Sequence, residues 1–102
     1  MIRIALDAMG GDFAPEVPVR GAVMALGEIP AQCEILLVGP TAVVEAELAK
    51  QGGPRPNLRI VEAPEVVGMA EKPLEAVKKK PNSSIAVGLT LQKKGEADAF
   101  IS

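Results

Sequence analysis

The sequence has no histidine, tryptophan or tyrosine, and its 102 residues include only one cysteine and two phenylalanines. Without histidine, the chain lacks the commonest general base, every Ser-His or Cys-His nucleophilic pair, and the commonest metal ligand. Cys33 has no second cysteine to pair with, which excludes an internal disulfide and suits a reducing compartment. We therefore expect a site that uses neither a metal nor a cofactor, and chemistry that does not depend on histidine.

The sequence also lacks an excess of positive charge, since it has 11 basic and 13 acidic residues and a net charge of -2. Such a chain has no broad basic field for a nucleic acid. Phe13 and Phe100 alone do not form a stacking platform for bases. No apolar run is long enough to span a bilayer, and residues 1–7 are too short and too charged for a signal peptide. Nucleic-acid binding is therefore not expected.

What the sequence does have is a regular alternation of strand and helix patterns. The residues 35–38, Ile-Leu-Leu-Val, form a continuous apolar run that is typical of a strand buried on both faces. Such alternation predicts a parallel sheet covered by helices on both sides. The predicted strands span 2–7, 34–38, 58–62 and 97–101, and the predicted helices span 15–28, 41–51, 73–80 and 85–94.

The fold class that follows is α/β, a three-layer Rossmann-like sandwich with a mostly parallel sheet. Local signals also predict the helix ends. Thr41 is the expected N-cap of the second helix, Ser83 and Ser84 are N-cap candidates for the last, and Gly52-Gly53 should end the second.

In a parallel α/β sheet, ligands bind outside the carboxyl ends of the strands. This rule selects Asp7–Asp12 after the first strand, Gly39 after the second, 63–72 after the third and Ser102 after the fourth. Cys33 comes before its strand and so belongs to the opposite edge, where we expect it to be inert packing.

The turn Asp7-Ala8-Met9-Gly10-Gly11-Asp12 is the most unusual of these segments. Adjacent glycines permit positive φ and close backbone approach, and the helix that follows offers free N–H groups to an anion. The turn matches neither a dinucleotide fingerprint nor a P-loop. The alternative is a plain strand-to-helix turn with Asp12 as the helix cap. Asp7 and Asp12 alone are a weak signal for a divalent cation.

Two lysine features are open to more than one interpretation. Lys72 precedes a helix whose dipole opposes its charge, which suggests a nearby phosphate or carboxylate, although it is equally an ordinary surface lysine. Lys78-Lys79-Lys80 is a solvated helix end, or else a patch for a phosphate or an acidic partner.

Several segments, in this order, resemble one family. They are IALDAMGGDFAPE from Ile4, LLVG from Leu36, EVVGMAEKP from Glu65, SSIAVGL from Ser83 and ADAFIS from Ala97. They are similar to the N-terminal region of the bacterial phosphate acyltransferases of phospholipid synthesis (the PlsX type). The resemblance covers nearly the whole chain, and the two segments around Gly10 and Gly68 make it specific. The family usually has histidine where this sequence has Phe13.

The resemblance implies transfer of a fatty acyl group from acyl carrier protein to inorganic phosphate, which gives an acyl phosphate. It also implies a cytoplasmic homodimer in peripheral contact with the membrane. The alternatives are a non-catalytic phosphate-binding or interaction module, and a nucleotide-binding half-domain, which the absent fingerprint disfavours. The resemblance and the edge rule together give the candidate phosphate-binding or substrate-binding residues Asp7, Gly10, Gly11, Asp12, Lys72 and Ser102, and no catalytic residue is assigned.

The family's chains are considerably longer than 102 residues. The resemblance therefore implies that residues 1–102 are the N-terminal part of a single α/β domain, that the sandwich is incomplete in this chain, and that this segment alone is inactive. Acyl carrier protein is acidic in general, and its docking surface should therefore be basic. The lysines available for it are Lys78, Lys79, Lys80, Lys93 and Lys94, which we expect to form one cluster.

Overall fold

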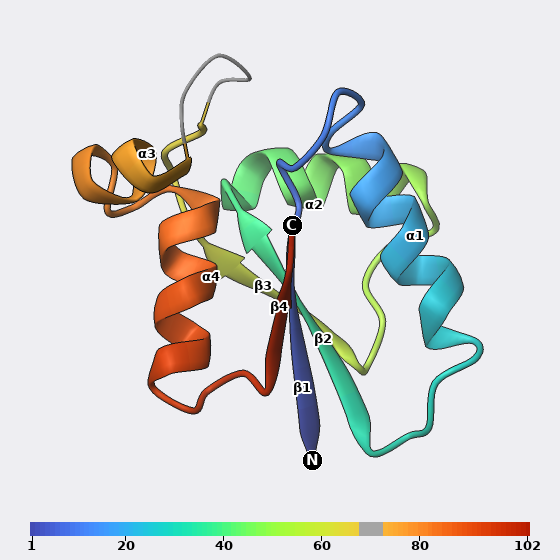
Figure 1. The fold of residues 1–102 in the computed structure, drawn as a ribbon. Helices are drawn as coiled ribbons and strands as arrows, with labels where there is room; N and C mark the ends of the chain where they lie inside the picture. Colours follow the sequence, from blue (N-terminus) through green and yellow to red (C-terminus); the bar gives the residue numbers. More distant parts are fainter. Residues whose placement is uncertain (68–72) are drawn as a thin grey trace.

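A computed structural model describes residues 1–67 and 73–102 of the chain (Figure 1). Strands and helices alternate, as the sequence predicts. The elements are β1 (Ile2–Asp7), α1 (Glu16–Leu26), β2 (Cys33–Gly39), α2 (Thr41–Lys50), β3 (Leu58–Glu62), α3 (Pro73–Lys79), α4 (Ser84–Lys93) and β4 (Ala99–Ile101). Within the described part of the chain, no helix has the length and apolar character needed to cross a bilayer.

The described strands form one sheet in the order β3-β2-β1-β4, and every pair of neighbours is parallel. β1 therefore lies inside the sheet, between β2 and β4. Ile4 pairs with Ile35 on one side and with Ala99 on the other, so the first strand of the chain holds the last one in place. The predicted parallel sheet is confirmed, and it is wholly parallel in the described residues.

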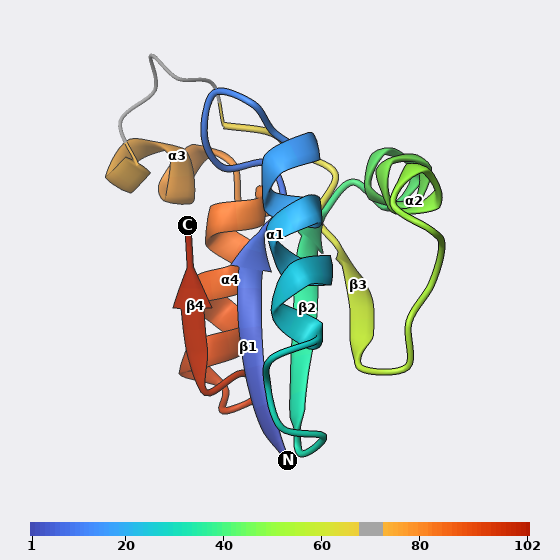
Figure 2. The ribbon, with the colours of Figure 1, turned by 90° about the vertical axis from the view of Figure 1, so that its right-hand side faces the viewer.

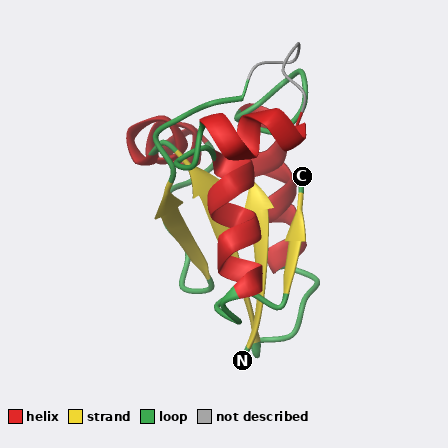
Figure 3. Cartoon of the chain, turned by 60° about the vertical axis from the view of Figure 1, so that its left-hand side comes forward, coloured by secondary structure: helices red, strands yellow, loops and turns green. Residues whose placement is uncertain are grey.

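Helices cover both faces of this sheet, with α1 on one side and α4 on the other (Figures 2 and 3). β2 alternates between the two cores, because Ile35 and Leu37 pack toward α1 and α2 while Leu36 and Val38 pack toward α4. All four of these side chains are almost fully buried. The apolar run therefore belongs to a strand buried on both faces, and the three-layer α/β architecture is confirmed.

The observed boundaries differ from the predicted ones by at most two residues. The largest difference in a strand is at β4, which begins at Ala99 and not at Ala97. Before β4, the Asp98 N–H donates to the Arg3 carbonyl oxygen at 2.7 Å, so the chain already contacts β1 there without strand geometry. Cys33 is buried at the start of β2, at the edge where the sequence places it.

One predicted cap is wrong and another is confirmed. Thr41 is the first residue of α2 and Pro40 is the N-cap, with an extended backbone at φ -61 and ψ 119 and no side-chain cap. Ser83 does cap α4, because its hydroxyl oxygen accepts a hydrogen bond from the Ala86 N–H at 3.3 Å. Gly52 and Gly53 end α2 with positive φ angles of 104 and 92 degrees, as predicted.

The packing of α4 on the sheet depends on a glycine. A β-carbon on Gly88 would overlap the ring of Phe100, a residue of β4 that packs against the core on this face. The ring occupies the space that any side chain at this position would need. Gly88 therefore allows α4 to approach β4 closely, and this keeps the last described strand against the helix layer.

We predict that Gly88→Ala lowers the free energy of unfolding by about 1–3 kcal/mol, because the new methyl group overpacks the contact with Phe100. Gly21→Ala is the matched control, since Gly21 lies in α1 with no atom near the position of a β-carbon. That change should raise stability by up to about 1 kcal/mol through helix propensity. Denaturant unfolding measures both, and stabilisation by both substitutions would contradict this account of the packing.

Candidate functional site

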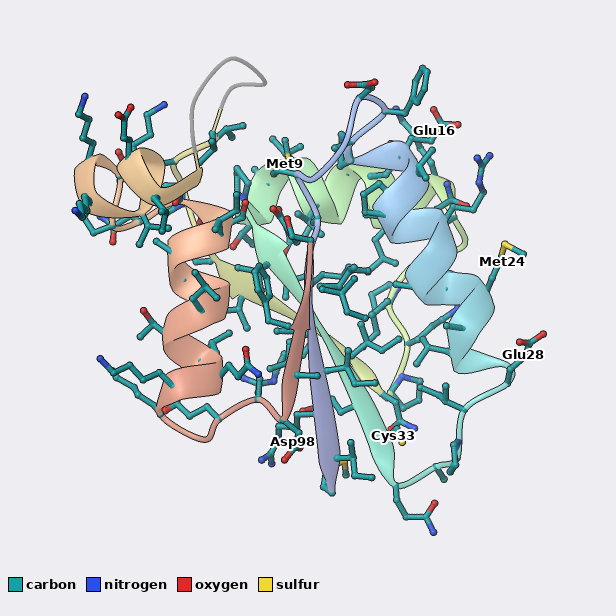
Figure 4. All side chains as sticks on the ribbon, viewed as in Figure 1. Met9, Glu16, Met24, Glu28, Cys33 and Asp98 are labelled. Atoms are coloured by element: carbon teal, nitrogen blue, oxygen red, sulfur yellow. The ribbon has the colours of Figure 1, made fainter. Side chains whose placement is uncertain are left out.

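The loops that follow the strands meet at the carboxyl edge of the sheet, which is the upper end in Figure 1. Met9 lies at this edge, whereas Cys33 and Asp98 lie at the opposite, amino edge (Figure 4). Ligands of parallel α/β sheets bind at the carboxyl edge. The segments selected from the sequence therefore do meet at one end of the molecule, as far as the structure describes them.

Asp7 lies at the centre of this edge and is only 3% exposed, at the end of β1. Its Oδ1 accepts a hydrogen bond from the Met9 N–H at 2.9 Å. Its Oδ2 accepts one from the Ser102 hydroxyl at 3.1 Å. One carboxylate therefore joins the turn after β1 to the residue after β4.

The two glycines of the turn serve different purposes. Gly10 has an ordinary negative φ, but a β-carbon there would lie 3.3 Å from Asp7 Oδ2, so glycine leaves room for the carboxylate. Gly11 has a φ of 89 degrees and open space around it, so its need for glycine is purely conformational. The sequence permits a positive φ and a close backbone approach in this turn, and the structure has the positive φ at Gly11 and the close approach at Gly10.

Asp12 is exposed at the outer end of the turn. The alternative interpretation, in which Asp12 caps the first helix, is wrong, because α1 has Pro15 as N-cap and no side-chain cap. In the first turn of α1, Glu16 lies 3.7 Å from Arg20, so its negative charge has a cationic partner. The start of α1 has no side-chain cap, but it offers few N–H groups, because Pro15 and Pro18 have none and the Val17 N–H donates to the Phe13 carbonyl oxygen at 3.0 Å.

Two other helices that start at this edge have side-chain acceptors already in place. The Thr41 N–H of α2 donates to Glu62 Oε1 at 3.3 Å, and Ser83 caps α4. A carboxylate at the start of α2 repels an anionic ligand there. Before α1, the glycine turn leaves the Gly11 N–H without an acceptor among the described residues, so this turn is the candidate position for an anion.

Lys72 lies outside the described residues, so its expected contact with phosphate or a carboxylate stays a prediction. In the part of the chain that the structure describes, no three carboxylate or cysteine side chains gather in a way that could hold a metal ion. The arrangement of Asp7, Gly10 and Ser102 is a set of hydrogen-bonding groups and a close backbone approach. Around the buried Asp7 carboxylate, the backbone of the turn and the Ser102 hydroxyl are the neutral groups available to position a small oxyanion.

The lysines do not form the single cluster that the sequence suggested. Lys78 and Lys79 are exposed at the end of α3, near the carboxyl edge, whereas Lys93 and Lys94 are exposed at the far end of α4. The 10 residues of α4 separate the two groups by about 15 Å. The Lys80 side chain already has a hydrogen-bond partner, because its Nζ donates to the Val66 carbonyl oxygen at 3.1 Å.

A parallel sheet with helices on both faces, and with a glycine turn after its first strand, defines an α/β protein of the class that binds ligands at the carboxyl edge. Comparison with known proteins narrows this class. The profile of the family described as "Fatty acid synthesis protein" matches residues 2–102, and the chain belongs to this family.

Curated relatives agree with one another in name. The chain is 52% identical over 101 residues to a "Phosphate acyltransferase" of Salinibacter ruber, and this match covers 98% of the chain and 30% of the relative. It is 51% identical over 104 residues to one of Desulforamulus reducens, and 48% identical over 101 residues to one of Herpetosiphon aurantiacus. The chain spans about 30% of the length of these relatives, so their matching part is one end of a longer protein.

Sequence reasoning selected Asp7 and Ser102 separately but missed the hydrogen bond between them. The two residues are 95 positions apart, and neither local pattern contains the other. The sequence does show that Asp7 ends one predicted strand and that Ser102 follows another. This places the two side chains together only if β1 and β4 are known to be neighbours in the sheet.

We predict that Gly11→Ala lowers the free energy of unfolding by about 1–2 kcal/mol, since an L-residue at this φ is strained. Gly53→Ala is the matched control, because Gly53 also has a positive φ and open space but lies beyond α2. The two losses should be similar in denaturant unfolding. If Gly53→Ala destabilises the protein and Gly11→Ala does not, the positive φ is not required in the turn.

Proposed function

We propose that the protein that contains this segment transfers a fatty acyl group from acyl carrier protein to inorganic phosphate, for phospholipid synthesis. The observation that carries the proposal is the match to relatives named phosphate acyltransferase at 48–52% identity over nearly the whole segment. The site at the carboxyl edge is consistent with it. We call the segment together with the C-terminal sequence that its relatives have the full-length protein.

The proposed reaction needs no nucleophilic side chain. An oxygen of phosphate attacks the thioester carbonyl, the carbon–sulfur bond breaks, and the carrier leaves as a thiolate that takes up a proton. The products are an acyl phosphate and free carrier protein. What the protein supplies is the alignment of phosphate with the thioester and hydrogen bonds to the tetrahedral oxyanion. A sequence without histidine suits this reaction.

The sequence offered the backbone N–H groups of Gly10 and Gly11 as candidate phosphate donors, with Lys72 as the candidate cation. The Gly10 N–H already donates to the Asp7 carbonyl oxygen at 3.3 Å, so the Gly11 N–H is the candidate donor in the turn. Phe13 stands where the resembled family usually has histidine, and it is 73% exposed beside the turn. An exposed phenyl ring carries no proton to transfer. Proton transfer at this position is therefore not part of the proposed mechanism.

The remaining features of the proposal follow the resemblance. Residues 1–102 are the N-terminal part of a single α/β domain, and the rest of the domain completes the sheet and the site. The full-length protein is a cytoplasmic homodimer that contacts the membrane peripherally and needs no cofactor. The β4 strand, with Ile101 53% exposed, offers apolar surface that further elements of such a domain would cover.

The activity is tested with full-length protein, a fatty acyl thioester of acyl carrier protein, and phosphate. We predict release of free carrier thiol that depends on phosphate, together with an acyl phosphate that hydroxylamine traps. The isolated segment 1–102 is the control and should release none. Phosphate binding without turnover would replace the proposal by the non-catalytic phosphate-binding module.

The carrier should dock near the exposed lysines of α3, since acyl carrier protein is acidic and these lysines lie by the carboxyl edge. Lys78 and Lys79 are exposed there, whereas Lys80 already donates to Val66. Lys93 and Lys94 offer the same charge at the other end of α4. The two pairs thus form a matched set for testing where the carrier arrives.

We predict that reversing both charges in Lys78→Glu/Lys79→Glu lowers the association rate with acyl carrier protein on the order of tenfold at low salt. The salt dependence of that rate should also weaken. The control Lys93→Glu/Lys94→Glu changes the net charge equally and should have a much smaller effect. Equal effects of both double variants, measured by stopped flow, would contradict docking near α3.

A further inference from the structure

Two hydrogen bonds close the opposite ends of the contact between β1 and β4. At the carboxyl edge, the Ser102 hydroxyl donates to Asp7 Oδ2 at 3.1 Å. At the amino edge, the Arg3 N–H donates to Asp98 Oδ2 at 2.8 Å. Each bond joins residues 95 positions apart, so each ties the beginning of the chain to its end. Only the first of the two lies where the ligand is expected.

The bond at the carboxyl edge fixes the direction in which the Ser102 hydroxyl acts. A carboxylate oxygen accepts hydrogen bonds and a serine hydroxyl has a single hydrogen to donate. With that hydrogen directed to Asp7, the oxygen of Ser102 has only lone pairs left for anything else. Toward a ligand, Ser102 is therefore an acceptor and not a donor.

Asp7 is poorly suited to touch an anion itself. Its side chain is buried, both of its oxygens already accept hydrogen bonds, and its negative charge repels phosphate. It instead holds the two groups on either side of it. Oδ1 fixes the Met9 N–H at the start of the glycine turn, and Oδ2 fixes Ser102.

We propose that Asp7 is a positioning residue that makes the carboxyl edge selective for a protonated oxyanion. The inference rests on the proposed function and explains how its phosphate site distinguishes phosphate from sulfate. At neutral pH, inorganic phosphate carries at least one P–O–H group, which donates to the Ser102 oxygen. The Gly11 N–H, which has no acceptor among the described residues, donates to another phosphate oxygen. Sulfate has the same shape but no proton to donate, so its oxygen would meet the lone pairs of Ser102.

The test is the selectivity between phosphate and sulfate in full-length protein carrying Asp7→Asn. The asparagine oxygen keeps the bond from Met9, and its amide N–H₂ now donates to the Ser102 oxygen. The serine hydrogen is then free to point toward the ligand. The apparent KM for phosphate should rise and sulfate should inhibit better, so that the selectivity ratio falls about tenfold or more.

Asp98→Asn is the matched control, because it makes the same chemical change at the other end of the β1–β4 contact. It should leave the selectivity ratio at the wild-type value. A loss of stability common to both variants, measured by thermal unfolding, does not alter this comparison. A selectivity ratio that is the same in Asp7→Asn, Asp98→Asn and wild type overturns the proposal.

Ser102→Ala keeps the inference testable if Asp7→Asn fails to fold, because Ser102 is exposed and its loss leaves the core intact. This variant should weaken phosphate binding and lower the selectivity ratio, and an unchanged ratio would overturn the proposal. Calorimetric titration with phosphate and with sulfate gives the same ratio without acyl carrier protein. Wild-type protein that forms no acyl phosphate contradicts the proposed function, whereas active wild type with unaltered selectivity in the variants contradicts only this inference.

Discussion

The described structure depends on the pairing of β1 on both of its sides. Residues 2–7 pair with β2, and residues 4–6 pair at the same time with β4, at the far end of the sequence. Ala5, in the middle of the strand, is fully buried, and so is Leu36, its partner in β2. Without this central strand, β4 would have no neighbour among the described strands, and α4 would lose part of the sheet surface on which it packs.

This pairing also gives the two ends of the sheet different roles. At the amino edge, the Arg3 backbone N–H donates to the Asp98 carboxylate, and the Arg3 guanidinium lies 3.2 Å from Glu34. At the carboxyl edge, a buried carboxylate instead organises a glycine turn and a hydroxyl. Side chains that are already paired stabilise an edge, whereas groups held in place with unused hydrogen-bonding capacity prepare it to bind a ligand.

The fold was largely predictable from the sequence, and the contacts of the site were not. The apolar run of β2 predicts a strand buried on both faces, and the adjacent glycines permit the positive φ found at Gly11, because both signals are local in the sequence. The prediction for Thr41 failed because Pro40 adopts the extended conformation of an N-cap, so Thr41 is already helical. The bond from Ser102 to Asp7 joins residues from opposite ends of the chain, and no local pattern contains it. The lysines were grouped wrongly because the direction of α4 decides how far apart they lie.

The central claim is that phosphate binds at the carboxyl edge beside the turn after β1. Crystals of the full-length protein soaked in arsenate, an anomalously scattering analogue of phosphate, test it most directly. The account predicts an anomalous peak about 4 Å from the backbone nitrogen of Gly11 and from the oxygen of Ser102, since arsenic lies one bond behind the arsenate oxygen that makes each hydrogen bond of about 3 Å. A peak at the amino edge near Arg3, or the absence of any peak beside the turn, would contradict it.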